Sequence, residues 1–118
     1  MAYSGEEKRK YPRLGRKFMV SYRLADESDM MDLSQTKNVS LGGMLLTTSK
    51  IFTPGTNLMI EIRLPYEINP LKIAGKVMDS KEIVKNLIYD TRVEFISIDD
   101  AHKKVITKTV EHYLKEQS

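Results

Sequence analysis

The sequence predicts a mainly β fold, a six-stranded antiparallel β-barrel with a C-terminal α-helix and a flexible, basic N-terminal arm. Two patterns carry this prediction. Between residues 17 and 98 apolar and polar residues alternate in short segments, and after residue 99 the apolar residues recur at helical spacing. Strands that are apolar on one face and joined by short connections bury those faces in a closed or nearly closed barrel. With 118 residues the chain should be one domain, with the arm at 1–14, the barrel at 15–98 and the helix at 99–118.

The N-terminal arm concentrates the positive charge of the chain. Six cations lie within ten positions, and these are Lys8, Arg9, Lys10, Arg13, Arg16 and Lys17. The formal net charge of the whole chain is only +3, so the attraction for anions should be local. Because residues 1–14 also lack apolar periodicity, we expect them to be mobile in the free protein.

The first three strands are predicted from alternation of varying clarity. The clearest case spans residues 17–24, where one face carries Phe18, Val20, Tyr22 and Leu24. A weaker strand is expected at about residues 32–39, and it leads into the stretch Asn38–Gly43. Met44 then begins the third strand.

Three further strands are predicted after the turn Thr53–Thr56, whose Pro and Gly occupy positions that such turns favour. They are expected at about residues 57–64, 71–78 and 87–98. Gly75 lies inside the second of them and indicates a bulge or a close approach of another group. The predicted inner face of the last strand carries Tyr89, Thr91, Val93 and Phe95.

The last element should be an amphipathic helix capped by Asp99 or Asp100. Its apolar stripe consists of Val105, Ile106, Val110, Tyr113 and Leu114. We expect this stripe to dock on an end or flank of the barrel, although it could equally serve a partner or a dimer.

Composition excludes several classes of protein. The chain has no cysteine, so disulfides and thiolate metal sites are excluded. No apolar run approaches the roughly 18 residues of a membrane span, and no apolar secretion signal begins the chain. We therefore expect a soluble, cytoplasmic protein without a metal or cofactor.

Catalytic patterns are also missing from the sequence. The two histidines, His102 and His112, lie ten residues apart on the predicted helix, which places them on different faces. No phosphate-binding loop of the GxxxxGK type occurs, and no serine has the context of a nucleophile elbow. The sequence therefore predicts a binding protein and not an enzyme.

Two separated stretches contain groups suited to a nucleotide. Arg9 and Arg13 can each give paired donors to a phosphate or to the O6/N7 edge of guanine. The stretch Asn38–Gly43 offers an amide, the hydroxyl of Ser40 and two glycines in one tight connection, which suits close approach of the backbone to a ligand. A guanine nucleotide with phosphates is the ligand class that these groups favour.

The order and separation of the two stretches resemble the PilZ family of bacterial cyclic di-GMP receptors. Arg9 and Arg13 fit its RxxxR signature, and Asn38, Ser40 and Gly43 fit its (D/N)xSxxG signature. Short strands followed by a terminal helix are also the layout of that family, so the resemblance covers nearly the whole chain.

The resemblance implies a receptor for cyclic di-GMP (c-di-GMP) in second-messenger signalling. Arg9 and Arg13 would bind guanine edges and phosphates, Asn38 the Watson–Crick edge of a guanine, and Ser40 a phosphate or a guanine edge. Gly42 and Gly43 would let the backbone come close, and Lys8 and Lys10 are further candidates for contact. Asn38 stands where the motif more often has aspartate, so it should hold the guanine edge less firmly.

Binding would order the arm on the barrel and change the interaction surface. One or two ligand molecules per site are compatible with the resemblance, and Lys8 favours two. The protein partner is unknown, because motility, pilus, biofilm and transcription machinery are all open for the family.

Two alternative functions remain at this stage. One is a PilZ-like interaction module of motility or pilus machinery without a ligand, although such members usually lack the arginines found here. The other is a single-stranded nucleic-acid binder. Such surfaces need exposed aromatic side chains, and only Tyr3, Tyr11, Tyr66 and Phe52 lie off the predicted core faces.

Overall fold

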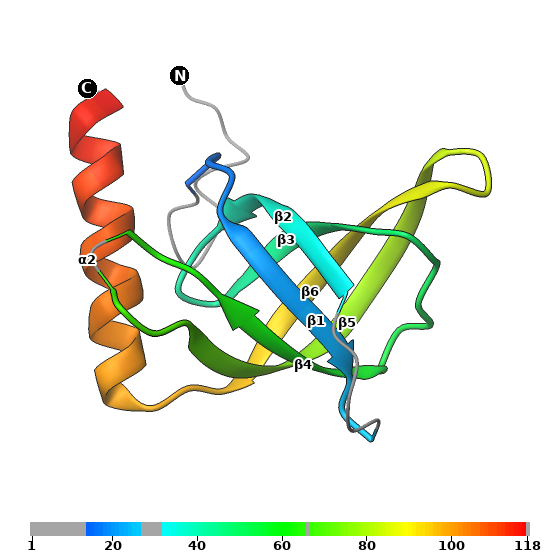
Figure 1. Ribbon diagram of the computed structural model, residues 1–118, viewed down its shortest axis with the longest axis horizontal. Helices are drawn as coiled ribbons and strands as arrows, with labels where there is room; N and C mark the ends of the chain where they lie inside the picture. The colour runs from blue at the N-terminus through cyan, green and yellow to red at the C-terminus, as the bar shows by residue number, and fades with distance from the viewer. Residues whose placement is uncertain (1–13, 27–31, 66, 118) are drawn as a thin grey trace.

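The computed structural model describes residues 14–26, 32–65 and 67–117, and these form a closed barrel with one helix beside it (Figure 1). The strand order around the barrel is β1-β2-β3-β6-β5-β4, and all neighbouring strands are antiparallel. The elements are β1 (Met19–Leu24), β2 (Asp32–Val39), β3 (Gly43–Thr48), β4 (Asn57–Ile62), β5 (Leu71–Val84), β6 (Ile88–Ser97) and α2 (Asp100–Gln117). The predicted six-stranded antiparallel barrel with a C-terminal helix is confirmed.

The barrel interior is filled by the apolar faces that the alternation predicted. Among its least exposed side chains, each at 1% or less, are Leu46, Leu58, Ile60, Ile62, Ile73, Val77 and Val93. Full burial of one such side chain stabilises the fold by about 1.5–3 kcal/mol. The inner faces therefore supply the main driving force for closing the barrel.

Gly75 confirms both expectations for a glycine within a strand. The β5–β6 register shifts between Ala74 and Gly75, which marks a bulge. A Cβ atom on Gly75 would lie 2.4 Å from Cγ1 of Val93 and 3.2 Å from Cδ1 of Ile60. Side chains from the two neighbouring strands, β6 and β4, therefore occupy the space that a side chain at this position would need.

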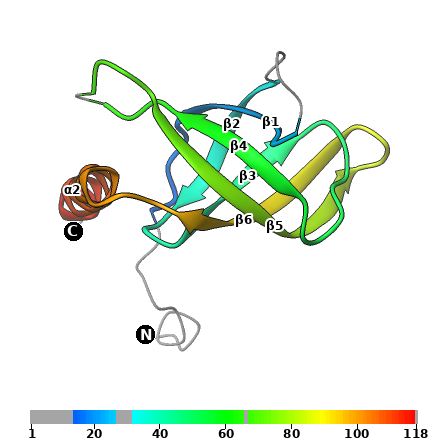
Figure 2. The same ribbon diagram turned by 90° about the horizontal axis from the view of Figure 1, so that it is seen from below.

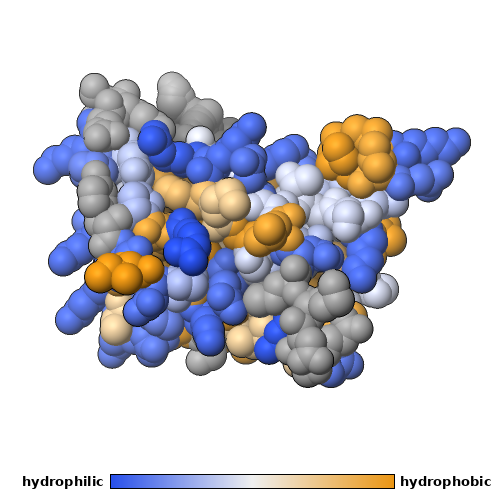
Figure 3. All heavy atoms as spheres, viewed as in Figure 1, coloured by the Kyte–Doolittle hydropathy of each residue, from blue (hydrophilic) through white to orange (hydrophobic). Residues whose placement is uncertain are grey.

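The hairpin of β5 and β6 is longer than predicted, because β5 continues to Val84 instead of ending near residue 78. Val77 still forms backbone hydrogen bonds with Gly55 and Thr56. Beyond Val77 the described partner of β5 is β6 alone, and this part of the hairpin projects from the barrel (Figures 1 and 2). The β5 half of it, residues 78–84, is exposed apart from the partly buried Ser80, so its sequence carries no alternation that would reveal a strand. Figure 3 shows an apolar cluster on this projection, to which Ile83, Val84 and Leu87 contribute.

Helix α2 packs on its own barrel, on the side opposite the projecting hairpin (Figures 1 and 2). Asp99 caps its start, since the carboxylate accepts a hydrogen bond from the His102 N–H at 2.8 Å. The predicted stripe faces the core, with Ile106, Val110 and Tyr113 buried. The Tyr113 ring lies 6.0 Å from that of Phe18. The expected docking within the chain is therefore confirmed.

Candidate functional site

The connection between β2 and β3 carries the predicted residues Asn38, Ser40, Gly42 and Gly43. Three hydrogen bonds fix its shape. Within the connection, the Ser40 N–H donates to the Gly43 carbonyl at 2.9 Å, and the Gly42 N–H donates to Ser40 Oγ at 3.2 Å. From β6, the Phe95 N–H donates to the Gly42 carbonyl at 2.9 Å. The last of these ties the connection to β6. Ser40 is buried and organises the turn from within.

Gly43 is required by packing between strands. A Cβ atom at this position would lie 2.1 Å from the backbone carbonyl oxygen of Val93 on β6. A backbone atom cannot move aside as a flexible side chain can, so the two strands pair closely only with glycine here. The structure thus gives Gly43 a role in the fold that sequence reasoning did not identify.

The first described residue, Leu14, is hydrogen-bonded to the end of β2, directly beside this connection. The Leu14 N–H donates to the Val39 carbonyl at 2.8 Å, and the Val39 N–H donates back to the Leu14 carbonyl at 3.0 Å. Leu14 is fully buried. Of the predicted site residues, Lys8, Arg9, Lys10 and Arg13 lie outside the described residues. The described chain nevertheless begins one residue after Arg13, next to the turn.

A second contact ties the segment after Leu14 to β2 and α2. The buried Thr36 hydroxyl accepts a hydrogen bond from the Phe18 N–H and donates one to the Arg16 carbonyl, both at 2.9 Å. The Arg16 guanidinium carbon lies 3.9 Å from the centre of the Tyr113 ring, a cation–π geometry. In the sequence Arg16 is recognisable only as one cation of the basic run. Its contact links the start of the barrel to the last turns of the helix.

The outer face of the barrel beside the connection forms a cross-strand row of three residues, Asn38, Leu45 and Arg92. The register places Asn38 opposite Leu45 and Leu45 opposite Arg92. Asn38 and Leu45 are half-buried and Arg92 is exposed. Of their neighbours along the strands, Val39, Met44, Leu46, Thr91 and Val93 are buried in the core, whereas Lys37, at the bulge, is exposed. Strand register would have been needed to find this row, and the sequence does not reveal it, because a bulge between Thr36 and Asn38 shifts the pairing.

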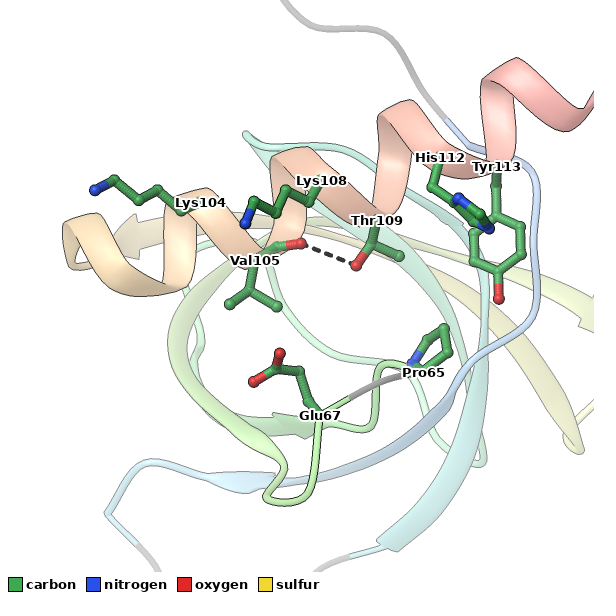
Figure 4. A pocket seen from close by; sticks show the side chains of 8 residues that line it. All are labelled: Pro65, Glu67, Lys104, Val105, Lys108, Thr109, His112 and Tyr113. Atoms are coloured by element: carbon green, nitrogen blue, oxygen red, sulfur yellow. Dashed lines mark hydrogen bonds between the residues drawn. The ribbon is translucent and has the colours of Figure 1, made fainter.

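A separate cavity of about 340 Å³ lies between α2 and the segment that follows β4 (Figure 4). Its described lining consists of Pro65, Glu67, Lys104, Val105, Lys108, Thr109, His112 and Tyr113. Lys104 and Lys108 belong to the helix side of the cavity and Glu67 to the opposite side, and the Thr109 hydroxyl donates to the Val105 carbonyl at 2.9 Å. No residue of the two sequence motifs lines this cavity, so it is distinct from the predicted site.

The residues that the structure describes form neither a metal site nor a membrane-spanning helix. They contain no group of three or more His, Cys, Asp or Glu side chains placed to hold a metal ion. None of their helices is long and apolar enough to cross a membrane. Phe52, expected to be free for base stacking, is instead buried with its ring edge-on to Tyr22 at 6.0 Å. That expectation was wrong, because the loop after β3 folds back over the barrel end.

Residues 7–112 match the family model of the PilZ domain. The chain belongs to the PilZ domain family. This confirms the resemblance drawn from the two motifs. PilZ domains are non-catalytic c-di-GMP receptors, which agrees with the prediction that the chain is not an enzyme.

Solved structures share the PilZ fold of this chain. The Bacillus subtilis inhibitor of motility, MotI/DgrA, matches with a TM-score of 0.73 at 18% identity, over 93% of this chain and 51% of that one. The PilZ domain of Escherichia coli YcgR with c-di-GMP matches with a TM-score of 0.70 at 17% identity, over 93% and 94% of the two chains. The K. pneumonia MrkH–c-di-GMP complex has a TM-score of 0.64 at 17% identity, over 93% and 54%.

These matches differ in how much of each relative they include. The PilZ chain spans about half the length of MotI/DgrA and of MrkH, and nearly all of the isolated YcgR domain. At such identities the likeness establishes the fold. None of the curated proteins matches the chain.

Proposed function

We propose that this PilZ chain is a c-di-GMP receptor that binds its ligand between the N-terminal arm and the β2–β3 connection. The observation that carries the proposal is the pair of hydrogen bonds between Leu14 and Val39. Leu14 follows Arg13 in sequence, and Val39 lies between Asn38 and Ser40. These two hydrogen bonds therefore join the residue that follows Arg13 to the residue between Asn38 and Ser40, although the two lie far apart in the sequence.

The chemistry of the connection suits a guanine nucleotide. In this proposal Arg9 and Arg13 supply guanidinium forks for phosphates and for the O6/N7 edge of guanine. Asn38, on the outer face, meets the Watson–Crick edge of a guanine. Its amide has one acceptor oxygen, so it holds that edge less firmly than a carboxylate would.

Ser40 has a hydrogen available for the ligand while it shapes the turn. Its Oγ accepts the Gly42 N–H at 3.2 Å, and its own hydroxyl hydrogen has only a long 3.4 Å contact with the Gly43 carbonyl. That carbonyl already receives the Ser40 N–H at 2.9 Å. A phosphate oxygen is a better acceptor than this shared carbonyl, so the hydroxyl can donate to the ligand without loosening the turn.

The arm was predicted at residues 1–14, but Leu14 is already buried and paired with Val39, so ligand binding orders the part of the arm before Leu14 on the barrel. The cations of the arm repel one another until a dianionic ligand neutralises them, and the arm then lies down over the connection. The Arg16–Tyr113 contact offers a route by which this change reaches α2. The output is an altered surface for a protein partner.

The setting of the receptor follows the family. We place it in the cytoplasm, where PilZ proteins usually act, in second-messenger control of motility or biofilm formation. Of these two processes, the similar fold of an inhibitor of motility supports motility. One or two c-di-GMP molecules bind per site, with Lys8 favouring two and Lys10 as a further contact.

An interaction module without a ligand is the second candidate. The exposed apolar side chains Ile83, Val84 and Leu87 on the projecting hairpin favour a protein-contact role. The complete RxxxR signature argues against this candidate, because PilZ-like members without a ligand usually lack these arginines.

Calorimetric titration of c-di-GMP into the full chain at physiological salt tests the proposal, with GTP and a short single-stranded oligonucleotide as controls. We expect saturable binding of c-di-GMP, micromolar or tighter, with no comparable response to the controls. No heat with c-di-GMP would favour the interaction module. An equal response to the oligonucleotide would favour a nucleic-acid binder.

A further inference from the structure

We propose that Arg92 is a third ligand-binding arginine of this PilZ chain, and that Asp79 competes with the ligand for it. This inference rests on the proposed c-di-GMP receptor function and names a contact outside both sequence motifs. It starts from the cross-strand row Asn38, Leu45 and Arg92 on the outer face of β2, β3 and β6.

The row places Arg92 within reach of a ligand that lies on Asn38. Neighbouring strands are about 4.8 Å apart, so the backbones at Asn38 and Arg92 are separated by about 10 Å. The half-buried Leu45 between them offers apolar surface to the face of a base or to a ribose. A dinucleotide with two guanines and two phosphates can cover this span, and the long arginine side chain shortens the distance further.

Arg92 is suited to this role by its chemistry and its exposure. It is the only arginine in β2, β3 and β6, strands that the structure describes throughout. Lys37, the nearby cation on β2, is already held by Asp90 at 2.7 Å. A guanidinium can pair with a phosphate, pair with the O6/N7 edge of guanine, or stack on the base.

The present partner of Arg92 is easily displaced. Asp79, opposite Arg92 on β5, forms an ion pair with it in which both side chains are 51% exposed. Exposed pairs of this kind contribute little to stability, because water solvates both charges. A phosphate can therefore replace the carboxylate. The carboxylate in turn repels the incoming dianion and keeps Arg92 engaged until the ligand arrives.

The experiment compares calorimetric affinities for c-di-GMP in the unaltered chain and five variants: Asp79→Asn, Asp79→Asn/Arg92→Ala, Asp79→Asn/Arg92→Lys, Arg63→Ala and Arg13→Ala. The Asp79→Asn background is essential, because removal of Arg92 alone would leave an unpaired carboxylate beside the ligand. Arg63 is an exposed arginine just past β4 and serves as the matched control for loss of one positive charge.

We expect Asp79→Asn to tighten binding about 3- to 10-fold by removing the competing carboxylate. Within that background, Arg92→Ala should weaken binding about 10-fold or more, and Arg92→Lys should fall between, because lysine keeps the charge but loses the fork. Arg63→Ala should stay within about twofold of the unaltered chain. Thermal unfolding should show that all variants fold.

Two results overturn the inference in distinguishable ways. If Asp79→Asn/Arg92→Ala binds as tightly as Asp79→Asn while Arg13→Ala loses affinity, Arg92 lies outside the site and the receptor function stands. If the unaltered chain does not bind c-di-GMP, the receptor function fails and the role of Arg92 fails with it.

Discussion

The β2–β3 connection and the β5–β6 hairpin both join neighbouring antiparallel strands, yet they are built in opposite ways. The β2–β3 connection, Ser40–Gly42, is short, hydrogen-bonded within itself and tied to β6. The β5–β6 hairpin projects from the barrel, turns through Asn86 at a φ of 59°, and exposes Leu87 by 61%. Residues in the first connection are therefore constrained by the fold as well as by any ligand, whereas those at the hairpin tip are free of packing constraints.

The largest expected effect is a loss of stability when Gly43, at the end of the β2–β3 connection, is substituted. Gly43→Ala should lower the free energy of unfolding by about 2–4 kcal/mol, because its Cβ meets the Val93 carbonyl oxygen and the strands must separate locally. Urea unfolding followed by circular dichroism measures the loss. Gly15→Ala is the matched control, since a Cβ at Gly15 has no described atom within 4 Å. A Gly43→Ala variant as stable as the control would show that the strands can accommodate a side chain here.

The motif arginines should give the next largest effects, now on binding. Arg9→Ala and Arg13→Ala should each weaken c-di-GMP binding about 10- to 100-fold, because each removes a charge-assisted contact. Arg16→Ala should cost much less affinity, since Arg16 lies outside the motif and stacks on Tyr113. Calorimetric titration at fixed salt measures all three. Equal losses would mean that the arm attracts the ligand only by diffuse charge.

A smaller effect is the dependence of stability on pH that Tyr22 causes at the barrel end near the loop after β3. Burial raises the pKa of Tyr22 above its usual value of 10.0, because the interior disfavours the charged phenolate. The unfolded chain therefore loses this proton first, and Tyr22 contributes stability that is complete below pH 10 and declines as pH rises toward the raised pKa. Tyr22→Phe should flatten part of the alkaline loss in thermal unfolding. An identical pH dependence in both proteins would contradict the assignment.

The smallest effect is expected at the hairpin tip. Leu87→Ser should change the free energy of unfolding by no more than about 0.5 kcal/mol, because the side chain is already in water. Ligand affinity should not change either. A large loss of stability in urea unfolding would show that the tip is packed, and the contrast between the two regions would fail.

The sequence predicted the barrel well because most strands bury one face. Alternation identified the inner residues of β4 and β6, and helical spacing identified the stripe of α2. Alternation failed for the outer half of β5, Asp79–Val84, since a strand segment with almost every residue exposed has no such pattern.

The candidate site was only partly predictable, for a related reason. Asn38, Ser40 and the glycines are recognisable because their residue types are unusual together. The Leu14–Val39 hydrogen bonds and the alignment of Asn38 with Arg92 depend on strand register, which a bulge near Lys37 resets. Gly43 was assigned to ligand approach, whereas its contact with the Val93 backbone depends on how closely β3 and β6 pair.

The most direct test of the central claim is amide hydrogen exchange, measured by NMR on the full chain with and without c-di-GMP. If the ligand lies between the arm and the β2–β3 connection, protection should rise together in residues 9–13 and 38–43, while the hairpin tip at residues 82–88 stays unchanged. Protection of the connection without the arm, or a response confined to the hairpin, would contradict the account.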